Sequence, residues 1–397
     1  MEKFSVSKST NQESNRLSDA ERIEAAETEM KLFAVGSALE SLEPHEELLQ
    51  QNFKLEMRRA GVENPDQRME SYIPLSEINI IARRDVAFMG RFDCDSKSIH
   101  INADGMYRSA DAKARRMLDN DEDFQSLLKL NHKLESKWGA YNFIAMRKYF
   151  ELRKRFLEKL DEVRESLLLL NVAETAIHEE LHALSYESRY TAVKQDDEGF
   201  IAARKIGVQE NSSQSKVDGS ASFRGERYRA VNEGITELYT LKLAQEFLKQ
   251  ATPGKLSGED MDGFFEFSEY HAYSRERWVV EQMIVIMSEI SEVPESVVED
   301  AFFAAYLNNE EIVPGEMLSR MTELLHDKKH EDVEALLLRL QVAMSENTFK
   351  SDSEIHRMTT EFVDHLPVAK QQAIKDRFEE LFFKYSFTKE LQDGVVE

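Results

Sequence analysis

The chain has 397 residues, 41% of them hydrophobic, so it can bury a sizeable core in one large domain or in several smaller ones. Its net charge of −24 disfavours nucleic acids and anionic membranes as partners, because both attract basic surfaces. No apolar run approaches the length of a membrane span, and the first residues are too polar for a secretory signal. The single cysteine, Cys94, excludes an internal disulfide and is better interpreted as a half-buried turn or strand residue than as a catalytic thiol. We therefore expect a cytoplasmic protein.

The N-terminal part of the chain is predicted to be a tail followed by helices. Residues 1–17 are rich in Ser, Asn and Lys and poor in apolar groups, which predicts a disordered tail. Residues 18–64 form the predicted N-terminal helical segment, because Ser18 can cap a helix that carries Glu21 three residues later. A second helix is predicted for 46–60, where a glycine and then a proline end the pattern.

A change of hydrophobic period opens the central domain, which we place at 65–290. Short apolar runs at 78–82, 86–89 and 98–102 predict three strands. From about 110 to 187 the chain has no proline and a single glycine, and its apolar spacing predicts long helices. The strands therefore precede a helical region.

Near the end of this helical region the chain reads His178-Glu179-Glu180-Leu181-His182. Two histidines four residues apart share one face of a helix, so both can ligate a single zinc ion. Glu179 lies beside the first histidine and can reach water at such a metal. The alternative is a charged helix that carries two histidines by chance, so the hypothesis needs a further ligand.

The segment 189–229 interrupts the helical pattern. Runs at 190–193 and 200–203 flank a turn rich in Asp and Gly, which predicts a hairpin. The polar stretch 211–220 is typical of a flexible loop. This insert is either a mobile lid over a substrate cleft or a surface addition, and the sequence favours neither.

A second motif, Asn232-Glu233-Gly234-Ile235-Thr236-Glu237, follows in a helix predicted for about 230–249. Glu233 and Glu237 are four residues apart and share a face. A carboxylate there can complete a His₂Glu zinc site, and the other glutamate can accept the free ring N–H of a ligand histidine. The stripe expected to be buried in this helix consists of Val231, Ile235, Leu238 and Leu241.

Together, the two motifs resemble those of the gluzincin metallopeptidases, the thermolysin-like branch of the zincins, whose pattern is HExxH followed by NExxxE. The resemblance implies that His178, His182 and Glu233 bind one Zn²⁺ per chain and that Glu237 orients the first histidine. It implies an α+β, mostly helical fold, with a zincin-like catalytic domain whose small sheet precedes the metal helix and with helical regions at both ends. No narrower subfamily is indicated, and the spacing between the motifs is longer than in compact gluzincins.

The resemblance also directs attention to the residues after the second motif, where a gluzincin usually supplies its transition-state stabiliser. Tyr273 is our first choice because it directly precedes a helix predicted for 275–290, and Tyr270 and His271 are alternatives. A purely structural role for each of them stays open. The helix at 275–290 is apolar on several faces and should be buried.

The C-terminal region, 291–397, is predicted to be helical, with helix starts near residues 294, 314 and 351. His326 and His330 repeat the four-residue spacing of the metal motif. The lysines between them would oppose a cation, so a solvated face is favoured.

These observations predict a zinc-dependent metallopeptidase that hydrolyses peptide bonds with a metal-activated water and Glu179 as general base. The expected partner is a peptide or protein substrate. The oligomeric state and the choice between endo- and exopeptidase action stay open. Two alternatives remain, namely a protein that binds metal without hydrolysis and a helical interaction protein.

Overall fold

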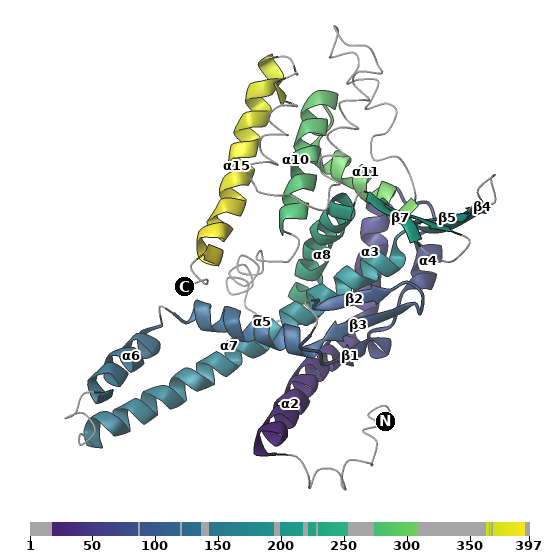
Figure 1. Ribbon diagram of the computed structural model, residues 1–397. Coiled ribbons are helices and arrows are strands. Elements are labelled where there is room, and N and C mark those ends of the chain that lie inside the picture. The colour runs from purple at the N-terminus through teal and green to yellow at the C-terminus, as the bar shows by residue number, and fades with distance from the viewer. Residues whose placement is uncertain are drawn as a thin grey trace. The chain divides into compact units, whose positions relative to one another are not determined.

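The computed structural model describes residues 18–85, 88–119, 121–135, 143–193, 199–216, 221–227, 229–252, 274–308, 363–364, 366 and 368–393. The described part is mostly helical with small sheets, which confirms the α+β, mostly helical class (Figure 1). None of its helices is both long and apolar enough to cross a bilayer. The tail predicted for 1–17 lies outside the described residues.

The chain forms two compact units, and the first comprises Met1–Glu46, Ile73–Ala176 and Gly254–Leu256. Its described elements are α2 (Asp19–Leu42), η2 (Glu43–His45), η4 (Leu75–Glu77), β1 (Asn79–Ile81), β2 (Gly90–Asp93), β3 (Ser98–Asn102), α5 (Ala103–Met117), α6 (Glu122–Glu135) and most of α7 (Phe143–Leu184). The start of α2 confirms the predicted cap, because the Glu21 amide donates to Ser18 Oγ (3.3 Å) and the Ser18 amide donates to Glu21 Oε2 (2.7 Å). Helix α2 then packs against α5 and β1.

The sheet of unit 1 has the strand order β1-β3-β2, with β1 parallel and β2 antiparallel to β3. Strands β1 and β3 lie where the sequence predicts them. The strand predicted for 86–89 is wrong at Phe88 and Met89, which precede β2, and residues 86 and 87 lie outside the described part. Strand β2 begins at Gly90 and pairs there with Ile101. The tight turn after β2 sets the register of β2 on β3, because Asp93 Oδ1 accepts hydrogen bonds from the amides of Asp95 and Ser96. Cys94 lies half-buried in that turn, as expected.

Unit 2 comprises Glu47–Tyr72, Ile177–Pro253 and Ser257–Glu397. Its described elements are α3 (Glu46–Arg59), α4 (Pro65–Arg68), η3 (Met69–Ser71), the end of α7, β4 (Glu187–Val193), β5 (Gly199–Ile206), β6 (Gln209–Lys216), β7 (Ala221–Arg227), α8 (Arg229–Ala251), α10 (Ser274–Ser291), α11 (Glu295–Asn308) and α15 (Val368–Asp393). The helices predicted for 46–60, 230–249 and 275–290 thus correspond to α3, α8 and α10.

The segment 189–229 folds as an antiparallel meander, β4-β5-β6-β7. The predicted hairpin is present, with Val193 opposite Phe200 at its end. The loop predicted for 211–220 is wrong over 211–216, because these residues belong to β6 and pair with both β5 and β7. Main-chain hydrogen bonds to two neighbouring strands outweigh the low strand propensity of the polar sequence. Residues 217–220 lie outside the described part.

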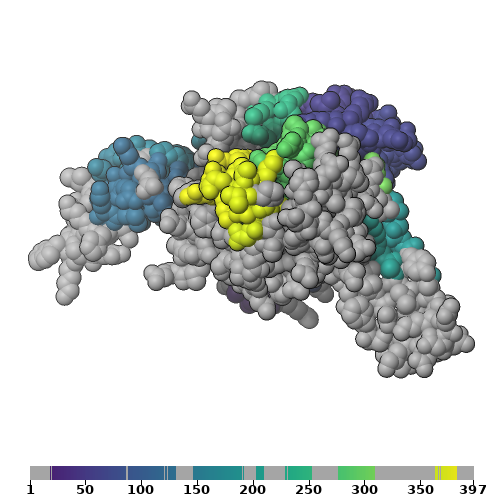
Figure 2. Space-filling view, turned by 90° about the horizontal axis from the view of Figure 1, so that it is seen from above, coloured from purple at the N-terminus to yellow at the C-terminus, as the bar shows by residue number. Residues whose placement is uncertain are grey.

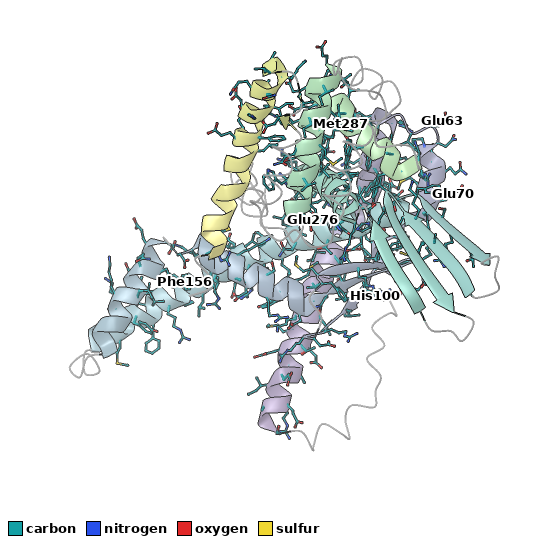
Figure 3. The ribbon with its side chains drawn as sticks, turned by 45° about the horizontal axis from the view of Figure 1, so that its top comes forward. Glu63, Glu70, His100, Phe156, Glu276 and Met287 are labelled. Carbon is teal, nitrogen blue, oxygen red and sulfur yellow. The ribbon has the colours of Figure 1, made fainter. Side chains whose placement is uncertain are left out.

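The core of unit 2 forms where α8 packs on α10 (Figure 1). Gly234 makes this close approach possible, because a Cβ at that position would lie 2.4 Å from the backbone oxygen of Glu276. Figure 3 shows Glu276 near the start of α10 and Met287 further along it. The apolar residues of α10 that the sequence singles out are buried, including Trp278 at 3% exposure.

The buried face of α8 differs in part from the predicted stripe. Val231 and Ile235 are fully buried, as expected, but Leu238 and Leu241 are only half-buried. Tyr239 takes their place in the core because its ring stacks on Phe303 of α11 at 3.7 Å. Other fully buried residues of α8 are Ala244 and Leu248.

Helix α15 covers α10 from the outside of unit 2. Ile374, Phe378 and Leu381 follow one another at helical spacing and are buried, so one face of α15 packs inward. Part of α15 lies at the surface, where Figure 2 shows it in yellow.

Candidate metal centre

Helix α7 carries the two histidines of the first motif. His178 and His182 are one turn apart, and their Nε2 atoms lie 3.2 Å from each other. Ile177 and Leu181, each directly before one of the histidines, are fully buried, so the helix is fixed by its apolar face while both imidazoles share another face.

Helix α8 brings Glu233 to the same point. Its Oε2 atom lies 3.4 Å from His178 Nε2 and 3.3 Å from His182 Nε2. One ligand atom from each of the three residues lies within 4.8 Å of the others, and this is the group of possible metal ligands found among the described residues. The structure therefore brings together all three residues that the sequence proposes as ligands.

The three ligand atoms fit a zinc ion in spacing and chemistry. Zinc–ligand bonds of about 2.0–2.1 Å at tetrahedral angles put neighbouring ligand atoms about 3.3–3.4 Å apart, close to the distances observed between them. Glu233 Oε2 is also buried, and no hydrogen-bond donor in the described part of the chain meets it with acceptable geometry. Leaving a carboxylate oxygen in this state is costly, and a cation between it and the imidazoles would relieve that cost.

Glu237 lies behind His178, on the side away from the other ligand atoms. Its Oε2 atom is 3.3 Å from His178 Nδ1, and its side chain is almost fully buried. A carboxylate at Nδ1 keeps the proton on that nitrogen, so the lone pair of Nε2 faces the centre. The arrangement matches the orienting role that the resemblance implies for Glu237.

The ionisable groups of the centre shift one another's pKa values. Burial alone would lower the pKa of His178, but its contacts with Glu233 and Glu237 and the charge of Glu179 raise this pKa to about 10. Burial alone would raise the pKa of the Glu233 carboxyl, yet its interactions with His182 and His178 bring it well below its usual range.

The β5–β6 turn is attached to the helix that carries Glu233. Asn232 directly precedes the candidate ligand Glu233 in the sequence, and its Oδ1 accepts a hydrogen bond from the Val208 amide (3.1 Å). Gly207 has a φ of +57°, and a Cβ there would lie 2.4 Å from Asn232 Oδ1 and 2.7 Å from the Tyr306 ring. This end of the meander is therefore held at the centre, which argues against a lid hinged here.

Tyr306 of α11 belongs to the centre, although nothing in the sequence points to it. Its hydroxyl lies 3.2 Å from His182 Nδ1 and 3.1 Å from Thr236 Oγ1. Burial raises the pKa of Tyr306, so the phenol stays neutral. The residue stands in an apolar run of α11 and is distant from both motifs in the sequence, so only tertiary contact reveals it.

Glu179 and Glu180 lie between the two histidines in the sequence, and both are buried. Glu179 is 7% exposed and lies near enough to His178 to influence its pKa, but it is outside the group of converging ligand atoms. Glu180 is fully buried and is not part of that group either. Both glutamates therefore lie outside the converging ligand atoms.

The predicted transition-state stabilisers, Tyr273, Tyr270 and His271, lie outside the described residues. So do His326 and His330 of the C-terminal region. No family model matches the chain, and no match was found among curated proteins or solved structures.

Proposed function

We propose that this chain is a zinc-dependent metallopeptidase of the gluzincin type. The observation that carries the proposal is the convergence of His178, His182 and Glu233 from two helices, with mutual distances of 3.2–3.4 Å. A carboxylate from a second helix at these distances argues against a chance origin of the first motif. The small sheet before α7 is compatible with a zincin-like catalytic domain, which is part of the proposal.

Each residue has a separate role in the proposed reaction. His178, His182 and Glu233 would hold the ion, and Glu237 orients His178. When bound, zinc supplies Lewis-acid chemistry that makes water acidic near pH ~7 and polarises a carbonyl. Glu179 takes the proton of the attacking water and passes it to the leaving amine. Tyr273, with Tyr270 and His271 as alternatives, stays our prediction for the donor to the developing oxyanion.

Two measurements on the intact chain test this proposal. Metal analysis of the purified protein should find about one zinc per chain, and a peptide library should be cleaved in a chelator-sensitive manner. Zinc without any cleavage would support a protein that binds metal without hydrolysis. A chain that takes up no zinc would leave only the helical interaction protein.

A further inference from the structure

We propose that Tyr306 is the positioning residue for His182, holding its imidazole in the tautomer that can bind metal. The inference rests on the proposed metal site and adds a residue from α11 to it. The phenol oxygen lies 3.2 Å from His182 Nδ1. Accepting a hydrogen bond from Nδ1–H there keeps the hydrogen off Nε2, the atom that faces His178 and Glu233.

The direction of this hydrogen bond follows from the ring nitrogen that faces the centre. With Nε2 of His182 turned to Glu233 and used for the ion, the ring hydrogen lies on Nδ1, so the Tyr306 oxygen accepts it. A phenol oxygen has more than one acceptor site, and Thr236 Oγ1 donates to the same oxygen at 3.1 Å, besides its bond to the backbone oxygen of Asn232 at 2.8 Å. Tyr306 therefore accepts from both His182 and Thr236.

The phenol group is held firmly enough to orient another side chain. Tyr306 is fully buried, and its ring lies nearly parallel to that of Phe303. Its backbone oxygen accepts the Tyr186 amide (3.2 Å), and the Tyr186 oxygen in turn accepts the Gly207 amide (2.7 Å). Main chain before β4 and in the β5–β6 turn thus fixes the residue that bears the hydroxyl, which is the support that a precise ligand geometry requires.

A neutral acceptor suits His182 because the centre is already rich in carboxylates. Glu179, Glu233 and Glu237 are each at most 8% exposed. A further buried carboxylate would add repulsion and a desolvation cost, whereas a phenol orients the ring without adding charge. The two histidines are therefore oriented differently, His178 by an anion and His182 by a neutral hydroxyl.

The test compares two conservative tyrosine variants of the full chain. Tyr306→Phe removes the hydroxyl at His182 and keeps the ring. Tyr239→Phe is a matched control, because Tyr239 stacks on Phe303 as well, but its hydroxyl contacts Glu299 and Asp300 rather than the centre. Zinc affinity is measured by competition with a chromophoric chelator, and the visible spectrum of the Co²⁺-loaded protein reports ligand geometry.

We expect Tyr306→Phe to bind zinc ~10–100-fold more weakly, as is typical when a group that orients a ligand is removed, and to alter the Co²⁺ spectrum. Tyr239→Phe should leave both unchanged. Equal zinc affinity in wild type and Tyr306→Phe would overturn the inference, and so would equal losses in both variants. A wild-type chain that binds no zinc would instead refute the proposed function itself.

A second variant keeps the inference testable if Tyr306→Phe does not fold. Thr236→Val leaves Tyr306 in place and removes the hydroxyl that donates to the phenol oxygen. The phenol then loses one of the two partners that hold it beside His182 Nδ1. Zinc affinity should again fall, by ~10-fold, and unchanged affinity would contradict the positioning role of the phenol.

Discussion

At the scale of single residues, the proposed roles in metal binding and in proton transfer belong to different side chains. The three converging ligand atoms come from His178, His182 and Glu233, while Glu179 is buried beside them and takes no part in that group. Each of these side chains can be substituted separately, so metal binding and proton transfer can be tested independently.

The first prediction concerns Glu179→Gln, which keeps the shape of the side chain and removes its basicity. We expect zinc content to stay near that of the wild type and peptide cleavage to fall by ~10²–10⁴, the range that a general base usually supplies. Glu180→Gln is the matched control and should retain the cleavage rate per folded molecule. Full activity of Glu179→Gln would exclude the role of base.

A second prediction uses the raised pKa of His178 in the metal-free chain. A histidine whose pKa is about 10 when folded and about 6.5 when unfolded stabilises the fold fully below pH ~6.5 and loses that contribution as pH rises towards 10. The free energy of unfolding of the metal-free protein should therefore decrease between about pH 7 and pH 10. Urea unfolding at several pH values measures it, and His178→Gln should lack this part of the decrease.

At the scale of elements, the centre depends on how closely two helices approach. Glu233 precedes the glycine at which α8 meets α10, so the contact between these helices sets the position of the candidate ligand. At Gly234 a methyl group would meet both the Glu276 oxygen (2.4 Å) and Val280 Cγ2 (2.6 Å). These atoms belong to the packed core and have little room to give way.

We therefore predict that Gly234→Ala forces α10 away from α8. Overpacking of this kind typically costs about 1–3 kcal/mol, so the melting temperature and the zinc affinity should both decrease. Gly105→Ala in α5 is the control, because its Cβ would meet its nearest neighbour at an ordinary contact of 3.4 Å. A Gly234→Ala protein with wild-type melting and zinc binding would show that the helices can separate without disturbing Glu233.

The meander β4–β7 shows a second relation between elements. Its β5–β6 turn is bonded to Asn232 and packs against Tyr306, so one end of the sheet is part of the wall of the centre. Residues 212–216 belong to the insert that the sequence leaves open as a lid or a surface addition, and they lie in β6 between two paired strands. Their deletion would remove a strand rather than shorten a loop, so it cannot serve as a test of a lid.

At the scale of the whole molecule, the candidate ligands all belong to unit 2, although α7 begins in unit 1. An ion held by both α7 and α8 would link the end of α7 to α8, two segments of unit 2 that are separated in the sequence by the whole meander. Binding that exists only in the folded state adds to its stability.

Metal removal should therefore lower the thermal stability of the chain. At a free zinc concentration 100 times the dissociation constant, the stabilisation is about 2.7 kcal/mol. Calorimetry of chelator-treated protein should show a lower melting temperature, restored by zinc but not by magnesium, which prefers oxygen ligands. A zinc-loaded protein whose melting is insensitive to chelation would contradict the proposed link.

The sequence by itself determined the local part of the centre. The spacing of His178 and His182 and that of Glu233 and Glu237 fix which side chains share a helix face, because helix geometry depends on near neighbours alone. The cap at Ser18 and the hairpin of β4 and β5 are local in the same sense. These features were predicted correctly.

Only the tertiary structure decided which distant residues complete the centre. The Tyr306 hydroxyl contacts His182. The missing side chain of Gly234 lets α10 pack closely on α8, and that of Gly207 lets the β5–β6 turn pack beside Asn232. The polar β6 became a strand for the same reason, since its partners are supplied by neighbouring strands. Such contacts join residues far apart in the chain, and their energies depend on packing and burial that no local pattern contains.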